Sequence, residues 1–118
     1  FNIVTKEIIF ITYKFLFNRL KGKIAVVTGG SRDIGRAISL KLAEEGAKVV
    51  VNFNQSEAGA NQTVAEIKSK GGEAIAIKAD VSKLDQVLKL KNETTAVFGE
   101  SVDVLVNNAG GLFARRTL

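Results

Sequence analysis

Residues 23–38, which read KIAVVTGGSRDIGRAI, contain the change of pattern that decides the fold. Residues 24–27 are a continuous apolar run, as expected of a strand that is buried on both faces. Small turn-forming residues follow at 28–31, and from Ile34 onward the apolar residues recur with helical spacing. The stretch therefore predicts a strand, a glycine-rich turn and a helix in direct succession.

This junction has the chemistry of a phosphate-binding site. The N-terminus of a helix presents unpaired N–H groups and the positive end of the helix dipole to an anion. Glycine lets the backbone approach such an anion closely, because it has no side chain. The stretch is therefore typical of the opening unit of a Rossmann-type nucleotide-binding fold.

Composition limits the class of protein. The chain has 118 residues, 46% of them hydrophobic and 25% charged, which is enough for one small α/β domain. It contains no cysteine and no histidine, so we expect no disulfide or thiolate metal site and a reducing, cytoplasmic environment. Its net charge of +5 comes from scattered lysines and arginines rather than from a basic stripe with aromatics, so we expect no nucleic-acid partner.

Residues 1–20 (FNIVTKEIIFITYKFLFNRL) differ from the rest and are interpreted as an apolar, basic extension that precedes the domain at residues 21–118. The apolar segment from Ile8 to Leu20 is shorter than the ~20 residues that span a bilayer. It also lacks the small-residue cleavage site of a signal peptide. An interfacial amphipathic helix remains the alternative, but we do not expect a membrane partner.

The remaining pattern alternates helices and strands. It predicts a helix at 34–45 stopped by Gly46, a strand at 47–53, a helix capped by Ser56 and ended by Gly71–Gly72, a strand at 73–78, a helix capped by Ser82 and closed by Gly99, and a strand at 102–106. The apolar faces expected on the three helices are Ile34, Ala37, Ile38 and Leu42; Ala60, Val64 and Ile67; and Leu84, Val87, Leu88, Val97 and Phe98. The fold class is therefore α/β, a partial Rossmann-type parallel sheet with the strand order 3-2-1-4 and an open fourth strand.

Three motifs at fitting intervals carry a family resemblance. TGGSRDIG at 28–35 looks like the TGxxxGxG loop of short-chain dehydrogenases/reductases, Asp80–Val81 looks like the pair that follows their third strand, and NNAG at 107–110 looks like their NNAG motif. The resemblance covers roughly residues 20–118. Within the family, the sequence around these motifs is most similar to 3-oxoacyl-[acyl-carrier-protein] reductase-like members. It implies an oxidoreductase that interconverts a carbonyl and an alcohol by hydride transfer, with a small-molecule or acyl-thioester substrate. We also expect the full-length protein to form a homo-oligomer.

The resemblance implies a set of residues that contact the cofactor. Asn107 is expected mainly to tie neighbouring strands together, whereas Asp80 and Val81 hold the adenine ring. The candidate cofactor-binding residues are Gly29, Ser31, Arg32, Asp33, Ile34, Gly35, Asn54, Asp80, Val81, Asn108, Ala109 and Gly110.

Asp33 departs from the family pattern, because it stands where the family loop has its second glycine. A carboxylate there adds bulk and repels a pyrophosphate, by about 1 kcal/mol at 4 Å in water and by more at lower dielectric. Either Asp33 turns outward, toward Arg32 or Arg36, or the affinity for the cofactor is reduced. We interpret it as a tolerated variant rather than as the sign of a dead site.

Charge also bears on the choice of cofactor. A site for NAD(H) has an acidic side chain at the end of the second strand, but this segment reads Asn52, Phe53, Asn54 and Gln55. Arg32 could instead bind a 2′-phosphate with its planar, charged guanidinium group. We therefore expect NADP(H) to be preferred, with NAD(H) as the alternative.

The catalytic residues of the family cannot be placed in this chain. Family members use a serine and a Tyr-x-x-x-Lys pair, but the sole tyrosine, Tyr13, precedes the first family strand and is followed four residues later by Phe17. We expect no catalytic residue and no metal site here, so the chain is interpreted as an N-terminal fragment that is inactive alone. A non-catalytic nucleotide-binding module of the same fold is the alternative.

Overall fold

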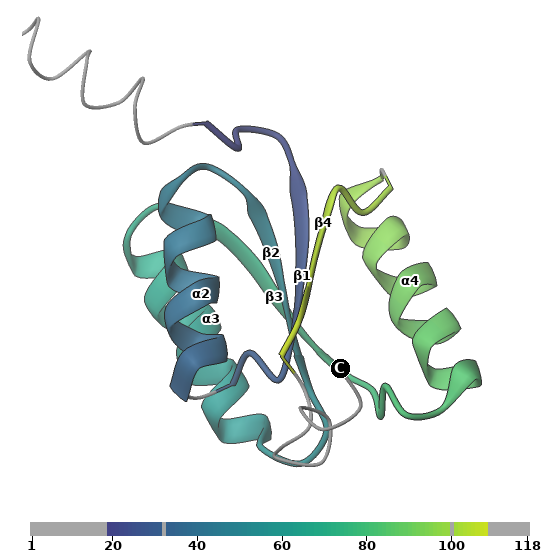
Figure 1. Cartoon of the computed structure of the whole chain (residues 1–118). Coiled ribbons are helices and arrows are strands. Elements are labelled where there is room, and N and C mark those ends of the chain that lie inside the picture. Colours follow the sequence, from purple (N-terminus) through teal and green to yellow (C-terminus); the bar gives the residue numbers. More distant parts are fainter. Residues whose placement is uncertain (1–18, 32, 100, 109–118) are drawn as a thin grey trace, which may run out of the picture.

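The structure, a computed structural model, describes residues 19–31, 33–99 and 101–108. Within these ranges, strands and helices alternate along the chain: β1 (Ile24–Thr28), α2 (Asp33–Glu44), β2 (Lys48–Phe53), α3 (Glu57–Ser69), β3 (Glu73–Lys78), α4 (Leu84–Phe98) and β4 (Val104–Asn107). The α/β alternation is confirmed (Figure 1).

The strands form one parallel sheet in the order β3-β2-β1-β4, as the sequence predicted. The chain first builds β2 and β3 on one side of β1, and α4 then carries it back to place β4 on the other side. The direction of winding therefore reverses beside β1. In open α/β sheets, ligands bind outside the carboxyl ends of the strands at such a reversal.

Helices cover both faces of the sheet. Figure 1 shows α2 and α3 together on one face and α4 alone on the other. The core under α2 and α3 includes Val27, Val49, Val51 and Ile67, and the core under α4 includes Val50 and Leu90. All five residues of β1 are buried, because this central strand has a helical layer on each side.

Helix α2 ends as predicted before Gly46, which has a φ of 98°. Its expected apolar face is partly wrong, because Ile34 is 60% exposed and Ala37 is also exposed. Gly35 and Ser39 are buried instead, and the Ser39 hydroxyl donates to the Gly35 carbonyl oxygen at 2.9 Å. These small residues let α2 lie close to the loop after β1, which the large apolar side chains would prevent.

Helix α3 buries Ala60 and Ile67, as predicted, with Thr63 between them. Ser56 stands at the N-cap position, but its side chain makes no capping hydrogen bond. Ser56 is therefore the N-cap residue, as predicted, but without the usual side-chain hydrogen bond. The Ser56 carbonyl oxygen accepts the backbone N–H of Ala60 at 3.1 Å, so its contribution is made by the main chain.

Helix α4 corrects two further expectations. Its N-cap residue is Lys83, and Ser82 is not the cap because its hydroxyl donates to Asp80 Oδ1 at 2.6 Å. The expected apolar face is largely exposed at Leu84, Val87, Leu88 and Val97, whereas Leu90 and Thr94 are buried. One helix over this face can turn only one of its apolar stripes toward the sheet. Gly99 ends α4 in the left-handed conformation, with a φ of 76°, as predicted.

Strand β4 is shorter than the predicted 102–106 segment and pairs only with β1 among the described strands. Asp103 lies before it and forms two bonds with Ile24: its Oδ2 accepts the Ile24 N–H at 2.9 Å, and its own N–H donates to the Ile24 carbonyl at 2.8 Å. Leu105 pairs in register with Val26 and is 65% exposed, so the α4 face of the sheet is bare along β4.

Two residues at the predicted extension boundary contact the domain. Leu20 packs against the core under α2 and α3, and its N–H donates to the Glu45 carbonyl at 2.8 Å. Arg19 forms a two-pronged ion pair with the buried Glu45 carboxylate, at 2.8 and 2.9 Å. Residues 1–18 lie outside the described residues. None of the described helices is both long and apolar enough to cross a membrane.

Candidate cofactor site

The candidate residues gather at the carboxyl edge of the sheet. Register pairs Thr28 with Asn107 and Phe53 with Lys78, so the parallel strands end together. The loop after β1, Asn54 after β2, Asp80 after β3 and Asn108 after β4 therefore share one edge. Three candidates lie outside the described residues: Arg32, Ala109 and Gly110.

Thr28 joins the ends of β1 and β4. Its hydroxyl oxygen lies 3.2 Å from the Val106 carbonyl oxygen and 3.3 Å from Asn107 Oδ1, and it accepts the Asn108 N–H at 2.9 Å. The Asn108 side chain donates to the Gly29 carbonyl at 3.3 Å. Asn107 thus ties the strands, as expected, and Asn108 fixes the loop after β1 from the side of β4.

Gly35 sets the distance between α2 and this loop. A Cβ atom at Gly35 would lie 2.0 Å from the Gly29 carbonyl oxygen and 2.7 Å from Asn108 Nδ2. Any side chain there would force α2 away from the end of β1. The glycine therefore keeps the N–H groups of the first turn of α2 beside the carboxyl edge, where an anion could meet them.

Asn52 holds the same loop from the side of β2. Its carbonyl accepts the Gly30 N–H at 3.2 Å, and its amide Nδ2 lies 3.2 Å from both the Ile77 and the Ala79 carbonyl oxygens. Asn52 is only 2% exposed, so its side chain serves the sheet and is not offered to a ligand. In the sequence, this structural role was indicated only by the position of Asn52 as a single amide within a largely apolar strand.

Ser31 is held by α3, through two residues that the apolar pattern of the sequence does not mark. The Thr63 hydroxyl lies 3.5 Å from the Ser31 carbonyl oxygen, and a Cβ atom at Gly59 would approach that oxygen to 2.7 Å. A buried threonine four residues after a helical glycine could have indicated this contact. The loop is thus fixed by β2, β4 and α3 together.

Asp80 carries a negative charge at the end of β3. Its Oδ1 accepts the Ser82 hydroxyl at 2.6 Å and the Ser82 N–H at 3.0 Å, and these bonds hold the pKa of Asp80 below its ordinary value. The Asp80 N–H donates a hydrogen bond to Gln86 Oε1 at 2.6 Å. Both Ser82 bonds end on one oxygen, so an ionised acceptor is fixed in place at this edge.

Exposed groups complete the described part of the site. Asn54 is exposed just after β2, Val81 is half-buried beside Asp80, and Ile34 presents an apolar side chain in the first turn of α2. A dinucleotide site needs such a combination of N–H donors, fixed polar acceptors and apolar surface for flat rings. The described residues contain no cluster of three or more side chains suited to a metal ion.

Asp33 begins α2 with a φ of 55°, which no other non-glycine residue shares in the described part of the chain. Its side chain is exposed. Of the two arginines toward which Asp33 could turn, Arg32 lies outside the described residues, and the Arg36 guanidinium donates to Glu66 instead. That ion pair lowers the pKa of Glu66 from its ordinary value, mainly through the hydrogen bond from Arg36.

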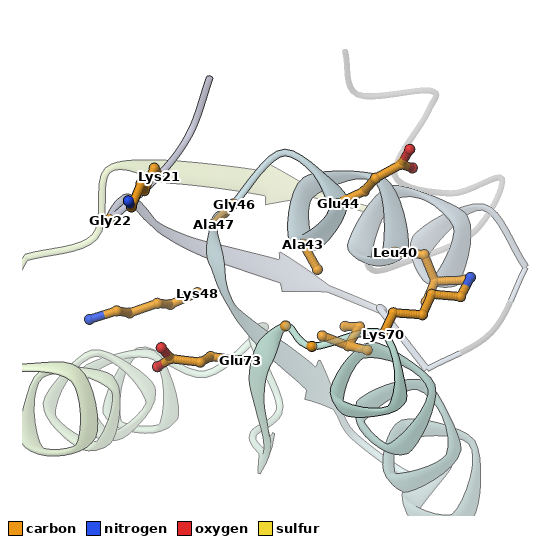
Figure 2. A pocket seen from close by; sticks show the side chains of 13 residues that line it. Lys21, Gly22, Leu40, Ala43, Glu44, Gly46, Ala47, Lys48, Lys70 and Glu73 are labelled. Carbon is orange, nitrogen blue, oxygen red and sulfur yellow. The ribbon is translucent and has the colours of Figure 1, made fainter. Parts of the chain in front are cut away.

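A separate hollow of about 790 Å³ lies at the opposite, amino edge of the sheet. Figure 2 shows Lys48 and Glu73, the first residues of β2 and β3, among the side chains that line it. The carboxyl ends of α2 and α3 also border this hollow. The helix dipoles present negative charge there, but three lysines and two glutamates also line the hollow, so its charge is mixed.

Comparison with known proteins identifies relatives with oxidoreductase names. Residues 23–117 match the family described as short chain dehydrogenase. A 3-oxoacyl-[acyl-carrier-protein] reductase of Staphylococcus epidermidis is 56% identical over 88 residues, which are 75% of this chain and 36% of the relative. Versicolorin reductase 1 of Dothistroma septosporum is 48% identical over 92 residues, which are 78% of this chain and 35% of the relative. The chain thus spans about a third of the length of these curated relatives.

Solved structures agree with the fold. A short chain dehydrogenase from Burkholderia cenocepacia in complex with NADP is 46% identical, with a TM-score of 0.75 over 80% of this chain and 38% of that one. A hydroxysteroid dehydrogenase from Escherichia coli is 39% identical, with a TM-score of 0.74 over 80% of this chain and 40% of that one. Both structures therefore share the parallel α/β fold of this chain over the matched part.

The described residues fit a nicotinamide dinucleotide, with one exception. The close approach at Gly35 keeps the amino end of α2 at the carboxyl edge, and the ionised Asp80 supplies a fixed acceptor two strands away. Asn54 after β2 and Ile34 in the first turn of α2 are exposed at this edge. The exception is Asp33, whose negative charge lies where the phosphates of the cofactor would meet α2.

Proposed function

This chain belongs to the short-chain dehydrogenase family, and we propose that it is the N-terminal, cofactor-binding portion of an NADP(H)-dependent oxidoreductase that reduces the carbonyl of a 3-oxoacyl thioester. The bound nicotinamide would supply or accept the hydride. The residues of this chain bind and orient the cofactor. One observation carries the proposal: Thr28, Asn52, Asn108 and Gly35 fix the loop after β1 against the first turn of α2.

Each described candidate has a role in this proposal. The N–H groups at the start of α2 receive the pyrophosphate, with Gly29, Ser31 and Gly35 shaping the loop. Asp80 and Val81 bind the adenine end, and Asn54 lies toward its ribose. Ile34 and Asn108 line the path toward the nicotinamide, and we add Ala109 and Gly110 to that lining from the sequence alone.

Preference for NADP(H) rests on charge. No carboxylate follows β2 until Glu57, the first residue of α3, so nothing in that loop repels a 2′-phosphate. Arg32 would bind that phosphate, which predicts that Arg32→Ala weakens NADPH binding while leaving NADH binding unchanged. Titration of both cofactors by fluorescence separates these outcomes, and an equal loss for both would remove Arg32 from this role.

The substrate class rests on a relative's name. The Staphylococcus protein is described as a 3-oxoacyl-[acyl-carrier-protein] reductase, and it is 56% identical in the matched segment. For the 118-residue chain itself we propose cofactor binding without turnover, because neither the serine nor the Tyr-x-x-x-Lys pair of the family can be placed in it. We further propose that the full-length enzyme is cytoplasmic and homo-oligomeric.

Two measurements on the 118-residue chain test this function. NADPH titration, followed by the change in its fluorescence, should saturate, and Asp80→Ala should weaken binding while the helical circular-dichroism signal is kept. A 3-oxoacyl thioester added with NADPH should give no sustained oxidation of the cofactor. Sustained oxidation would overturn the proposal of a binding portion without turnover, and absence of saturable binding would overturn the function as a whole.

Asp33 favours a second candidate, a nucleotide-binding module of the same fold that performs no catalysis in any form. The two candidates differ in the sequence that follows residue 118. A serine and a Tyr-x-x-x-Lys pair about 30 to 50 residues farther on would favour the enzyme, as the family resemblance implies. A longer chain without them would favour the module.

A further inference from the structure

We infer that Asp33 weakens the binding of phosphate-bearing cofactor through its charge, while its backbone conformation leaves the binding loop intact. This inference rests on the proposed cofactor site and adds to it a residue that sets the affinity. It concerns the one described candidate whose chemistry opposes the anion that the site is proposed to hold.

The backbone explains why an aspartate is tolerated at this position. Asp33 has a φ of 55°, in the left-handed region that side chains rarely adopt. Aspartate and asparagine visit this region more readily than other non-glycine residues, because their short polar side chains bond locally. The chain therefore passes through the turn with Asp33 much as it would with glycine, and α2 starts directly at this residue.

The charge of Asp33 has no described basic partner to offset it. Arg36, one turn along α2, donates to Glu66, and Lys70 lies 3.8 Å from the same carboxylate. Asp33 itself is exposed at the amino end of α2. Its negative charge thus stands at the end of the helix that would attract an anion, and it reduces that attraction.

Two substitutions separate charge from backbone. Asp33→Asn removes the charge and keeps a residue that tolerates the left-handed conformation. Asp33→Gly removes the charge and also the conformational cost. If charge is the cause, both variants of the 118-residue chain should bind NADPH about fivefold more tightly than the original chain, since one like-charge contact at close range costs that much.

A matched control changes the same net charge at the opposite edge of the sheet. Glu73→Gln neutralises the exposed first residue of β3, and it should leave NADPH affinity unchanged. Circular dichroism on every variant verifies that the helices persist. The gain from Asp33→Asn should also shrink between about 0.01 M and about 1 M salt, because the screening length falls from about 30 Å to about 3 Å.

The outcomes are separable. Saturable binding by the original chain with no gain in Asp33→Asn would overturn the inference and leave the proposed function standing. A gain in Asp33→Gly alone would assign the effect to the backbone and overturn the inference in the same way. If Glu73→Gln raised NADPH affinity as much as Asp33→Asn did, the effect would come from the net charge of the chain and not from the position of Asp33, and the inference would be overturned. If none of the chains binds NADPH, the proposed function fails and the inference fails with it.

Discussion

The backbone N–H of Asn108 donates to the Thr28 hydroxyl at 2.9 Å and thereby joins residues 80 positions apart. Through this bond the end of β4 fixes the end of β1, where the candidate loop begins. Because Asn108 also donates through its side chain to Gly29, the loop cannot move without breaking contacts to β4. The site therefore depends on the last described strand, although its best-known motif lies at the start of the domain.

Thr28→Val should remove this connection while keeping the shape of the side chain. The Asn108 N–H would then keep only its 3.2 Å bond to the Val106 carbonyl, so we expect a loss of about 1 kcal/mol in the free energy of unfolding and weaker NADPH binding. Urea unfolding and cofactor titration measure the two effects. Thr28→Ser retains the hydroxyl and should stay near the original chain in affinity, and an equally weak Thr28→Ser would contradict the role of the bond.

Gly35→Ala should displace α2 from the loop, because the added Cβ would lie 2.0 Å from the Gly29 carbonyl oxygen. We expect a destabilisation of about 1 to 3 kcal/mol and a loss of NADPH affinity of about tenfold or more. Ala37→Gly is the control, because it lowers helix propensity at an exposed position of α2 by about 1 kcal/mol without touching the loop. Equal losses of affinity in both variants would show that α2 stability, not its approach to the loop, governs binding.

Asn52→Leu and Asn54→Ala should separate a structural amide from a ligand-binding one. Loss of the Asn52 amide leaves the Ile77 and Ala79 carbonyls without this donor, so we expect about 1 to 3 kcal/mol of destabilisation. Asn54 is exposed, so its truncation should leave unfolding unchanged and weaken binding of a dinucleotide. A large decrease in the free energy of unfolding for Asn54→Ala would show that its amide stabilises the fold and does not serve the ligand.

Glu45 should make stability depend on pH. The Arg19 guanidinium, through its hydrogen bonds, holds the pKa of Glu45 below its ordinary value. A carboxylate with a lowered folded-state pKa contributes stability above its unfolded-state pKa of about 4.3, and this contribution is lost as the pH falls through the folded-state pKa. Glu45→Gln should therefore lower the urea midpoint at neutral pH, with the difference vanishing in acid.

Glu44→Gln is the control for that measurement. It removes the neighbouring carboxylate, which is half-exposed and lies 3.7 Å from Lys41 Nζ. Such an exposed pair contributes little to stability, so its urea midpoint should change less than that of Glu45→Gln at neutral pH. A pH profile that stays the same for Glu45→Gln and the original chain would exclude the Arg19–Glu45 pair as its source.

Among the described strands β4 pairs only with β1, and this edge should make the 118-residue chain prone to aggregate. An unpaired edge strand offers free backbone groups to other chains, and β4 carries the exposed Leu105 with no charged residue. Leu105→Lys should slow the growth of light scattering at fixed concentration. Leu88→Lys makes the same change on α4, away from the edge, and should slow the growth of light scattering less. An equal slowing by both variants would show that exposed apolar surface in general, and not the edge of β4, causes aggregation.

Local signals in the sequence were enough to predict the strands and helices and the order of the strands in the sheet. The apolar run at 24–27, the glycines at 46 and 99, and the alternation of strands with helices predicted a parallel sheet in the order that the structure has. The helix faces were less predictable. Leu84 and Leu88 have helical spacing, but α4 turns Leu90 toward the sheet because a single helix over that face buries one stripe.

The sequence by itself determined which chemistry the site could have, because residue type and spacing specify a glycine-rich turn, an acid after β3 and amides after β4. Tertiary structure decided which of those groups are offered to a ligand. Asn52 is turned into the sheet by two carbonyls of the segment that includes β3, whereas Asn54 remains exposed. The partner of Arg36 was decided in the same way, because Glu66 on α3 accepts its hydrogen bond. Such choices depend on distances between segments far apart in the chain, which no local pattern encodes.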